Sequence, residues 1–429
     1  MVSFLNQTND FERGITMKKL CTFLMIFAVL FMFSANLAVA KEKQPKVYKL
    51  GFITGLSGPL AHAAETQRKC VKLLVEQINE KGGLDMPWGK VPVEMLVKDD
   101  EMKLDVGVRR FRELVEAGCH GITGSIYNPM SAALNEECKI TGMPYIPGCV
   151  PALDSFKKGN PATATYSVAF TPWSIGWLMG DALIRGMGKK TFFWIGRPDS
   201  WGHTMLDGLK DSCKAFGGKI LGAETLPKGA PDFSAVINKA LAAKADVFAV
   251  NHFGGDAITC LKQAYDMGLH KYSMFFNCWS TYEVAMGIPE AVGDEFHALV
   301  YHYYDMSGFS DDLAERGRAL REDHIKMYGF PPDAYSVLAY TGASVLFQAV
   351  EKAGSVDYKK VGNVLGTITF ETVKGPSWFR IDHQMTGKYL AFLVQGKKPS
   401  DKKSKYDVYK VIGAYGGDMA LPSLKTLGY

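Results

Sequence analysis

Short apolar runs alternate with longer amphipathic stretches from Val47 onward, and this alternation constrains the fold more than any other feature of the chain. Residues 47–53 and 91–97 have the length and apolar content of strands. Between them, residues 64–81 place apolar side chains at helical spacing and stop at a glycine pair. A strand, a helix and a second strand in this order are typical of βαβ units, which build a parallel sheet.

The same pattern continues through the first half of the chain and restarts near Tyr166. In the rest of the first half it predicts helices over 104–115 and 131–141 and strands ending near 121–125 and 145–146. In the second half it predicts helices over 173–186, 202–216, 233–241 and 258–268 and strands over 191–195, 247–250 and 274–276. A chain of 429 residues with this pattern predicts an α/β fold of two Rossmann-like lobes.

The last third of the chain breaks the alternation. It predicts two helices, over 311–328 and 336–353, and then strand-like segments at 370–379 and 389–394. These segments must attach to the lobes already formed, so the chain is expected to cross between lobes more than once and to leave a ligand cleft at the hinge. We expect the first lobe to comprise residues 41–165 and 301–365, and the second lobe to comprise residues 166–300 and 366–429.

The N-terminal region has the order of a secretory signal peptide. Met17-Lys18-Lys19 is followed by an apolar run over 20–33 and by an Ala-x-Ala site, so we expect cleavage after Ala40 and a periplasmic protein. Either translation begins at Met17, or residues 1–16 are an extension removed with the signal. Cys21 precedes the apolar run instead of ending it, which disfavours a lipoprotein.

Charge and cysteine content exclude several classes of protein. The chain has 49 basic and 44 acidic side chains and no dense basic run, so we expect no nucleic-acid partner. Seven cysteines follow Ala40 and form no C-x-x-C pair, which argues against a zinc or iron–sulfur site. An odd number leaves at least one of them free, and the sequence does not decide whether any others pair.

Motifs of the common catalytic and cofactor sites are missing from the sequence. It contains no G-x-S-x-G elbow, no P-loop, no H-E-x-x-H and no G-x-G-x-x-G after a strand. Asp99-Asp100-Glu101 could hold a divalent ion, but acidic groups after a strand more often cap the next helix. We therefore expect no catalytic residues, no cofactor and no bound metal, and a protein that is not an enzyme.

Aromatic and small polar residues recur just past the predicted strand ends, where open α/β sheets bind ligands. They are Ser57, Tyr127-Asn128, Cys149-Val150-Pro151, Trp201, His252-Phe253 and Cys278-Trp279. Either tryptophan could instead pack in a core, and His252 could be a hydrogen-bonded loop residue. Several aromatics at one edge nevertheless favour a cleft that stacks against or encloses a small molecule.

Four segments in order carry a family resemblance: Gly55-Leu56-Ser57-Gly58-Pro59, Ile78-Asn79-Glu80-Lys81-Gly82-Gly83, Lys98-Asp99-Asp100 and Asp333-Ala334-Tyr335. With them, the chain from about Val47 to Val394 resembles the leucine/isoleucine/valine-binding proteins of ABC transporters, which are type I periplasmic binding proteins. The resemblance implies two lobes joined by three hinge crossings. It also implies a ligand trapped by lobe closure and delivered to the permease subunits.

The resemblance also implies ligand-binding positions. The loops that hold the amino acid's carboxylate in the family match Tyr127-Asn128 and Cys149-Val150-Pro151, where the usual serine and threonine hydroxyls are absent. No carboxylate stands at Cys278 or Trp279, where the family often holds the ammonium, and Asp256 could replace it or cap a helix. The predicted ligand-binding set is Ala63, Tyr127, Asn128, Cys149, Val150, Pro151, Trp201, Phe253, Trp279 and Tyr335.

These inferences predict a monomeric, periplasmic substrate-binding protein of an ABC importer. Its expected ligand is a branched-chain or other hydrophobic amino acid. One alternative keeps the transport role and replaces the ligand with an aromatic or aliphatic carboxylate, which the aromatic residues favour. Another is a ligand-sensing partner of a membrane receptor.

Overall fold

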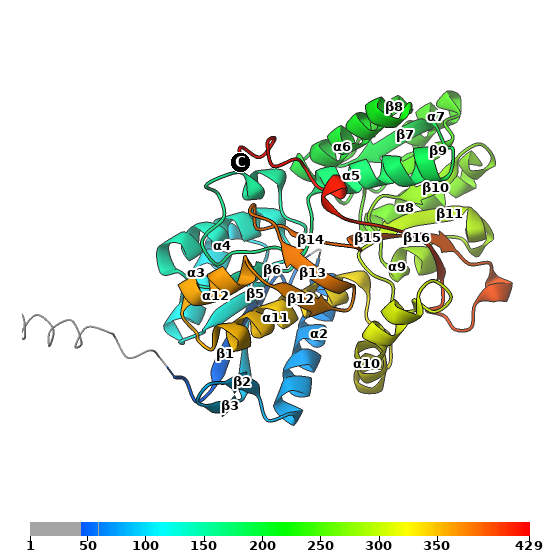
Figure 1. Cartoon of the computed structure of the whole chain (residues 1–429). Coiled ribbons are helices and arrows are strands. Elements are labelled where there is room, and N and C mark those ends of the chain that lie inside the picture. Colours follow the sequence, from blue (N-terminus) through cyan, green and yellow to red (C-terminus); the bar gives the residue numbers. More distant parts are fainter. Residues whose placement is uncertain (1–43, 59) are drawn as a thin grey trace, which may run out of the picture. The chain divides into compact units, whose positions relative to one another are not determined.

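The computed structural model describes residues 44–58 and 60–429, which form two main sheets with helices packed against them (Figure 1). The predicted α/β class is confirmed. The predicted signal peptide, the cleavage position after Ala40 and Cys21 lie outside the described residues. Among the residues that are described, no helix combines the length and the apolar content needed to cross a membrane.

The first sheet is parallel, with strand order β4-β1-β5-β6. Its strands are β1 (Tyr48–Thr54), β4 (Val93–Asp99), β5 (Gly121–Gly124) and β6 (Tyr145–Pro147). Its helices are α2 (Ala61–Glu80), α3 (Leu104–Glu116), α4 (Asn128–Thr141) and α11 (Ala334–Ala353). Phe52 is buried with residues of α2 and α11, whereas the next residue, Ile53, is buried with residues of α3 and α4. Because side chains alternate along a strand, the two helix pairs cover opposite faces.

The second sheet has the order β16-β15-β11-β10-β9-β7-β8, in which β15 pairs antiparallel with both β11 and β16 and all other pairs are parallel. Its strands are β7 (Thr191–Gly196), β8 (Lys219–Thr225), β9 (Val247–Val250), β10 (Met274–Asn277), β11 (Phe296–Val300), β15 (Ala391–Gly396) and β16 (Tyr409–Tyr415). Its helices are α5 (Pro172–Gly180), the π-helical segment η2 (Asp181–Gly186), α6 (Ser200–Phe216), α7 (Ser234–Ala243), α8 (Gly254–Asp266) and α9 (Tyr282–Gly287).

Helices α5 and α6 pack together on this sheet, and glycines allow their backbones to approach. A Cβ atom on Gly176 would lie 1.9 Å from the carbonyl oxygen of Met205, and one on Gly208 would lie 2.0 Å from that of Trp173. No larger residue fits either position without moving a helix. The packing fixes the start of α6, which follows the loop after β7.

Two smaller sheets complete the strands: the hairpin β2 (Leu84–Met86) and β3 (Gly89–Val91), and the antiparallel sheet β12 (Thr369–Thr372), β13 (Gly375–Phe379) and β14 (Met385–Gly387). The Gln348 amide of α11 donates to the carbonyl of Glu371 in β12 and accepts from its N–H. The sheet is therefore attached to a first-lobe helix, although the sequence places residues 366–429 in the second lobe. The other lobe limits stay predictions.

Three connections run between the two main sheets, and we number them as crossings. The first is 166–171, between a backbone bridge to β6 and the start of α5. The second is 301–310, between β11 and α10 (Asp311–Tyr328), a helix joined to α2 by a bond from Gln77 to Asp323. The third is 388–390, between β14 and β15.

The other elements are α12 (Tyr358–Leu365), η1 (Leu153–Phe156), η3 (Leu269–Lys271), η4 (Glu290–Glu295), η5 (Pro399–Asp401) and η6 (Asp418–Ala420).

The seven cysteines of the described chain are all buried and unpaired: Cys70, Cys119, Cys138, Cys149, Cys213, Cys260 and Cys278. Burial raises the thiol pKa of Cys119 to about 11 and that of Cys149 to about 12. Such thiols are protonated and inert at neutral pH, so they act as small apolar side chains.

Two buried histidines make the fold sensitive to acid. Burial is the main cause that lowers the pKa of His252 to about 4 and that of His302 to about 3. A histidine in the unfolded chain titrates near 6.5, so the unfolded state binds more protons between about pH 6.5 and 4. The free energy of unfolding therefore falls as the pH drops through that window and is fully present above it.

We predict that His302→Gln reduces this pH dependence. Between pH 6.5 and 4, the slope of unfolding free energy against pH should fall by up to about 1.4 kcal/mol per pH unit. Denaturant unfolding at four pH values measures the slope. His203→Gln, at an exposed position of α6, is the matched control and should leave it unchanged. An unchanged slope in His302→Gln would show that the folded structure does not lower the pKa of His302.

Candidate functional site

The main cavity has a volume of about 800 Å³ and opens where the parallel strands end. Its lining comes from the start of α2, the loops after β7 and β8, the start of α8, and α9. The lining residues are Leu60, His62, Ala63, Arg197, Lys228, Gly229, Phe253, Gly254, Gly255, Asp256, Ile258, Glu283, Met286 and Gly287. Residues that follow β1 thus face residues that follow four strands of the second sheet, in the position where α/β sheets bind ligands.

Two cationic side chains lie on the second-lobe wall of this cavity. Arg197 is paired with the carboxylate of Asp199, to which its Nε donates at 2.8 Å. Lys228 has no ion-pair or hydrogen-bond partner among the described residues. Its pKa is lowered, first by burial and then by the positive charge of Arg197. An ammonium group in this position would gain from an anionic partner.

The acidic side chains of the cavity are held by other groups. Asp256 accepts a hydrogen bond from the N–H of Gly229 at 3.0 Å, and the imidazole of His252 lies 3.9 Å from the same carboxylate. Asp256 therefore lies on the cavity wall and contacts the loop after β8; the N-cap of its own helix is Phe253, and no side chain caps that end. Its carboxylate can also accept from an ammonium group of a ligand.

A side-chain contact joins the two sides of the cavity. His62 of α2 contacts the carboxylate of Glu283 in α9 through Nε2. Burial is the main cause that raises the pKa of Glu283, and the nearby His62 opposes the shift. Next to this pair, the hydroxyl of Tyr282 donates to the carbonyl of Pro331 at 3.1 Å. Both contacts link residues of α9 to the first-lobe side.

Aromatic side chains form the wall behind the charged groups. Phe253 lines the cavity and meets Tyr335 edge to face, with ring centroids 5.0 Å apart. Trp279 is buried and packs edge to face on Phe170 at 5.3 Å. The indole N–H of Trp201 donates to the carbonyl of Asn251 at 3.4 Å.

The structure brings only part of the predicted ligand-binding set to this cavity. Ala63 and Phe253 line it, and Tyr335 contacts Phe253. The other predicted residues are not part of its lining: Tyr127 and Asn128 at the start of α4, and Cys149, Val150, Trp201 and Trp279 in buried positions.

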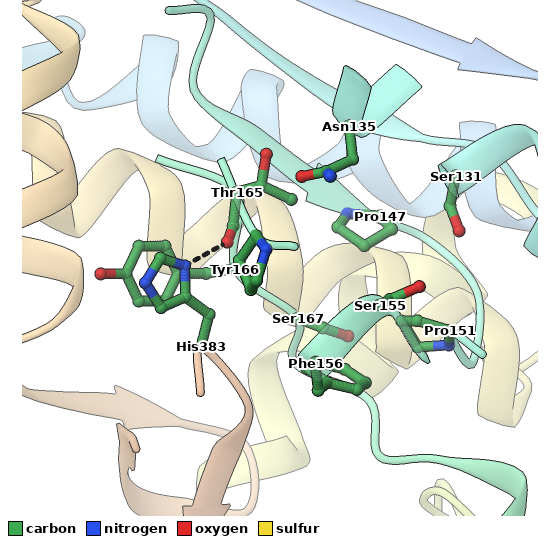
Figure 2. A pocket seen from close by; sticks show the side chains of 11 residues that line it. Ser131, Asn135, Pro147, Pro151, Ser155, Phe156, Thr165, Tyr166, Ser167 and His383 are labelled. Carbon is green, nitrogen blue, oxygen red and sulfur yellow. Dashed lines mark hydrogen bonds between the residues drawn. The ribbon is translucent and has the colours of Figure 1, made fainter. Parts of the chain in front are cut away.

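Pro151 lines a second, much smaller cavity in the first lobe (Figure 2). Its volume of about 20 Å³ is close to that of one water site. Beside it, His383 stacks on Tyr166 with centroids 3.9 Å apart and shares a 2.8 Å hydrogen bond with the carbonyl of Thr165. This cavity is too small for a metabolite.

Five charged or titratable lining residues were absent from the predicted set: His62, Arg197, Lys228, Asp256 and Glu283. A signal was present for two of them, since Arg197 directly follows β7 and Lys228 follows β8 by three residues. The sequence analysis chose aromatic and small polar residues just past the predicted strand ends. The same rule would have chosen Arg197 and Lys228 if it had also considered charged residues at those positions.

Comparisons with known proteins agree with this architecture. A family model described as periplasmic binding protein matches residues 47–403. Leu/Ile/Val-binding protein homolog 7 of Brucella abortus is 25% identical over 346 residues, which cover 76% of this chain and 82% of the relative. The leucine-, isoleucine-, valine-, threonine- and alanine-binding protein of Pseudomonas aeruginosa is 23% identical, with coverage of 76% and 84%.

Solved structures share the fold. An amino acid ABC transporter substrate-binding protein from Pseudomonas fluorescens Pf-5 matches with a TM-score of 0.79 and 20% identity, covering 90% of this chain and 99% of that one. A solute-binding protein of an ABC transporter from R. palustris, in complex with benzoate, matches with a TM-score of 0.72 and 19% identity, covering 87% and 99%. This chain belongs to the periplasmic binding protein family, as a type I member of the leucine/isoleucine/valine-binding kind.

Proposed function

We propose that this protein captures a small carboxylate-bearing molecule in its main cavity and presents it to the permease subunits of an ABC importer. The foremost ligand class is a branched-chain or other hydrophobic amino acid. The observation that supports this most is the cavity itself, which has the size of a metabolite site and is lined by residues on both sides of the hinge. The names of the Brucella and Pseudomonas relatives point to the same ligands.

The lining suggests how an amino acid is held. Lys228 and Arg197 lie where they can receive the carboxylate, and Asp256 lies where it can receive the ammonium. The apolar groups that remain for the side chain are Leu60, Ala63, Phe253, Ile258 and Met286. This arrangement places both charged ends of the ligand on the second lobe, whereas the resemblance implies a carboxylate clamp on the first.

An aromatic carboxylate is the second ligand class that a specific observation favours. Phe253 and Tyr335 offer an edge-to-face aromatic wall, and Lys228 and Arg197 supply positive charge without requiring an ammonium in the ligand. The R. palustris neighbour was solved with benzoate, which has this chemistry.

Lobe closure and a purely binding role complete the proposal. Ligand contacts to both lobes favour the closed state, and the His62–Glu283 pair is a contact that closure can form. We propose a periplasmic monomer, released after cleavage behind Ala40, that does not chemically change its ligand. Trp201 and Trp279 would support the cavity wall from behind. Tyr127, Asn128, Cys149, Val150 and Pro151 would contact the ligand only if closure exposes them.

We predict that the thermal shift caused by a ligand depends on the ligand's carboxylate. L-leucine should raise the melting temperature, because a ligand at 100 times its Kd stabilises the folded state by about 2.7 kcal/mol. 4-Methylpentanoate, which lacks the ammonium, should give a smaller shift, and leucinamide, which lacks the carboxylate, should give none. Benzoate tests the second ligand class in the same thermal-shift assay. If none of these compounds shifts the melting temperature, the proposed ligand classes are wrong.

We predict that Lys228→Met weakens binding of the ligand found by that screen about ten-fold, the typical effect of losing one charge-assisted hydrogen bond. Isothermal titration measures the Kd. Lys262→Met, at an exposed position of α8 outside the cavity lining, is the control for the loss of one positive charge. Equal affinities of the two variants would remove Lys228 from the site without affecting the transport role.

A further inference from the structure

A lysine is buried beside the hinge, away from the main cavity. Lys374 lies in the turn between β12 and β13, and only 1% of its surface is exposed. Lysine is almost never fully buried without an acidic partner. No carboxylate of the described chain lies within ion-pairing distance of Lys374, and burial lowers its pKa well below the ordinary value. The amine is therefore held as a hydrogen-bond donor in an apolar setting.

The contacts of this amine lie on two crossings. Its Nζ donates to the carbonyl of Leu390, in the third crossing, at 3.0 Å. The same atom lies 3.5 Å from the ring centroid of Tyr301, in the second crossing. Tyr301 is completely buried, so the amine and the ring have little freedom to separate without exposing polar and apolar surface.

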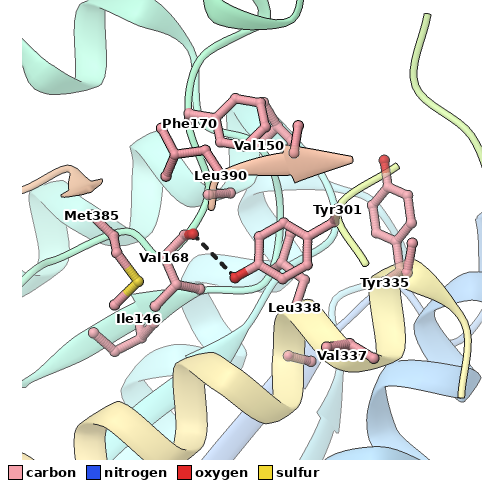
Figure 3. Close-up of a cluster of buried hydrophobic side chains, with 14 of the residues drawn as sticks. Ile146, Val150, Val168, Phe170, Tyr301, Tyr335, Val337, Leu338, Met385 and Leu390 are labelled. Carbon is pink, nitrogen blue, oxygen red and sulfur yellow. Dashed lines mark hydrogen bonds between the residues drawn. The ribbon is translucent and has the colours of Figure 1, made fainter. Parts of the chain in front are cut away.

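Tyr301 extends the linkage to the first crossing. Its hydroxyl donates to the carbonyl of Val168 at 3.3 Å, and Figure 3 shows this bond among the packed side chains of Phe170, Leu390 and Met385. Lys374 and Tyr301 thus connect one residue of each crossing through two hydrogen bonds and one ring contact. The first and second crossings are more than a hundred residues apart in sequence, and the β12–β14 sheet lies between the second and the third. No local structure therefore holds the three crossings together.

The linkage also reaches the aromatic residues packed behind the ligand cavity. Trp279 meets Tyr301 edge to face at 6.4 Å and Phe170 of the first crossing at 5.3 Å. Val150, Tyr335 and Tyr301 belong to one core cluster (Figure 3). A change in the angle between the lobes must therefore move or strain the contacts around Tyr301.

We propose that Lys374 is a positioning residue for lobe closure: it clamps the three hinge crossings to one another through Tyr301, so that they move as a unit. Without the clamp, the three crossings could twist independently, and the lobes would sample many relative angles. A clamp restricts the hinge to fewer states, which reduces the entropy lost when a ligand closes the cavity. The clamp is independent of which molecule the cavity binds.

Hydrogen exchange of the ligand-free mature protein tests the clamp with three lysine variants. Lys374→Met keeps the apolar volume and removes the donor. Lys374→Gln keeps an N–H donor without a charge. Lys388→Met removes an exposed lysine of the third crossing and is the matched control. We expect Lys374→Met to speed exchange about ten-fold in peptides covering all three crossings, since the loss of a buried hydrogen bond has this size.

The other variants separate a clamp from general destabilisation. Lys374→Gln should stay within about three-fold of the parent protein, and Lys388→Met should leave exchange unchanged. Tyr301→Phe should speed exchange at 166–171 and not at 388–390, because the bond to Val168 is lost and the ring contact with the Lys374 amine is kept. Strands β7 and β9 should keep their exchange rates in every variant. The proposal is wrong if Lys374→Met affects the third crossing alone, affects every segment equally, or has no effect.

Discussion

Every residue that lines the main cavity stands just beyond the carboxyl end of a parallel strand or on the helix that follows it. This holds for α2 after β1, Arg197 after β7, Lys228 after β8, α8 after β9 and α9 after β10. Parallel strands bring their ends to one edge, and the crossings turn the edges of the two sheets toward one space. The position of the cavity is thus a consequence of strand direction, and the rest of the site depends on it.

The chemistry of the cavity is set by which charges already have partners. The carboxylate of Asp199 pairs with Arg197, and the N–H of Gly229 donates to Asp256. Lys228 has charged groups nearby but no hydrogen-bond or ion-pair partner among the described residues. A ligand carboxylate would give this ammonium the anionic partner that it lacks. The hinge follows the opposite rule, because Lys374 has no charged neighbour to pair with and instead donates to a carbonyl.

The alternation of apolar runs was enough to predict the two-lobed α/β fold, because strand and helix periods differ and each lobe repeats them. It also predicted where a site would lie, and Ala63, Phe253 and Tyr335 are found at or beside the cavity. The sequence could not predict side-chain direction. Cys149 and Val150 follow β6 as expected, yet both are buried, and Val150 packs in the core cluster with residues of α11 and the hinge.

Contacts between residues far apart in the sequence could not be predicted from the sequence either. His62 and Glu283 meet across the cavity although they are 221 positions apart in the sequence. The attachment of β12 to α11 depends on the amide of Gln348, which no periodicity reveals. Such contacts are decided by how complete elements dock, after local propensity has been satisfied. The contacts that span the cavity and join the crossings are of this long-range kind.

The central claim is that one cavity between two lobes closes on a small carboxylate. Small-angle X-ray scattering of the mature protein, with and without the ligand that gives the largest thermal shift, tests it most directly. Closure predicts a smaller radius of gyration in the presence of saturating ligand, and no change with leucinamide. A ligand that binds and leaves the scattering curve unchanged would contradict the account.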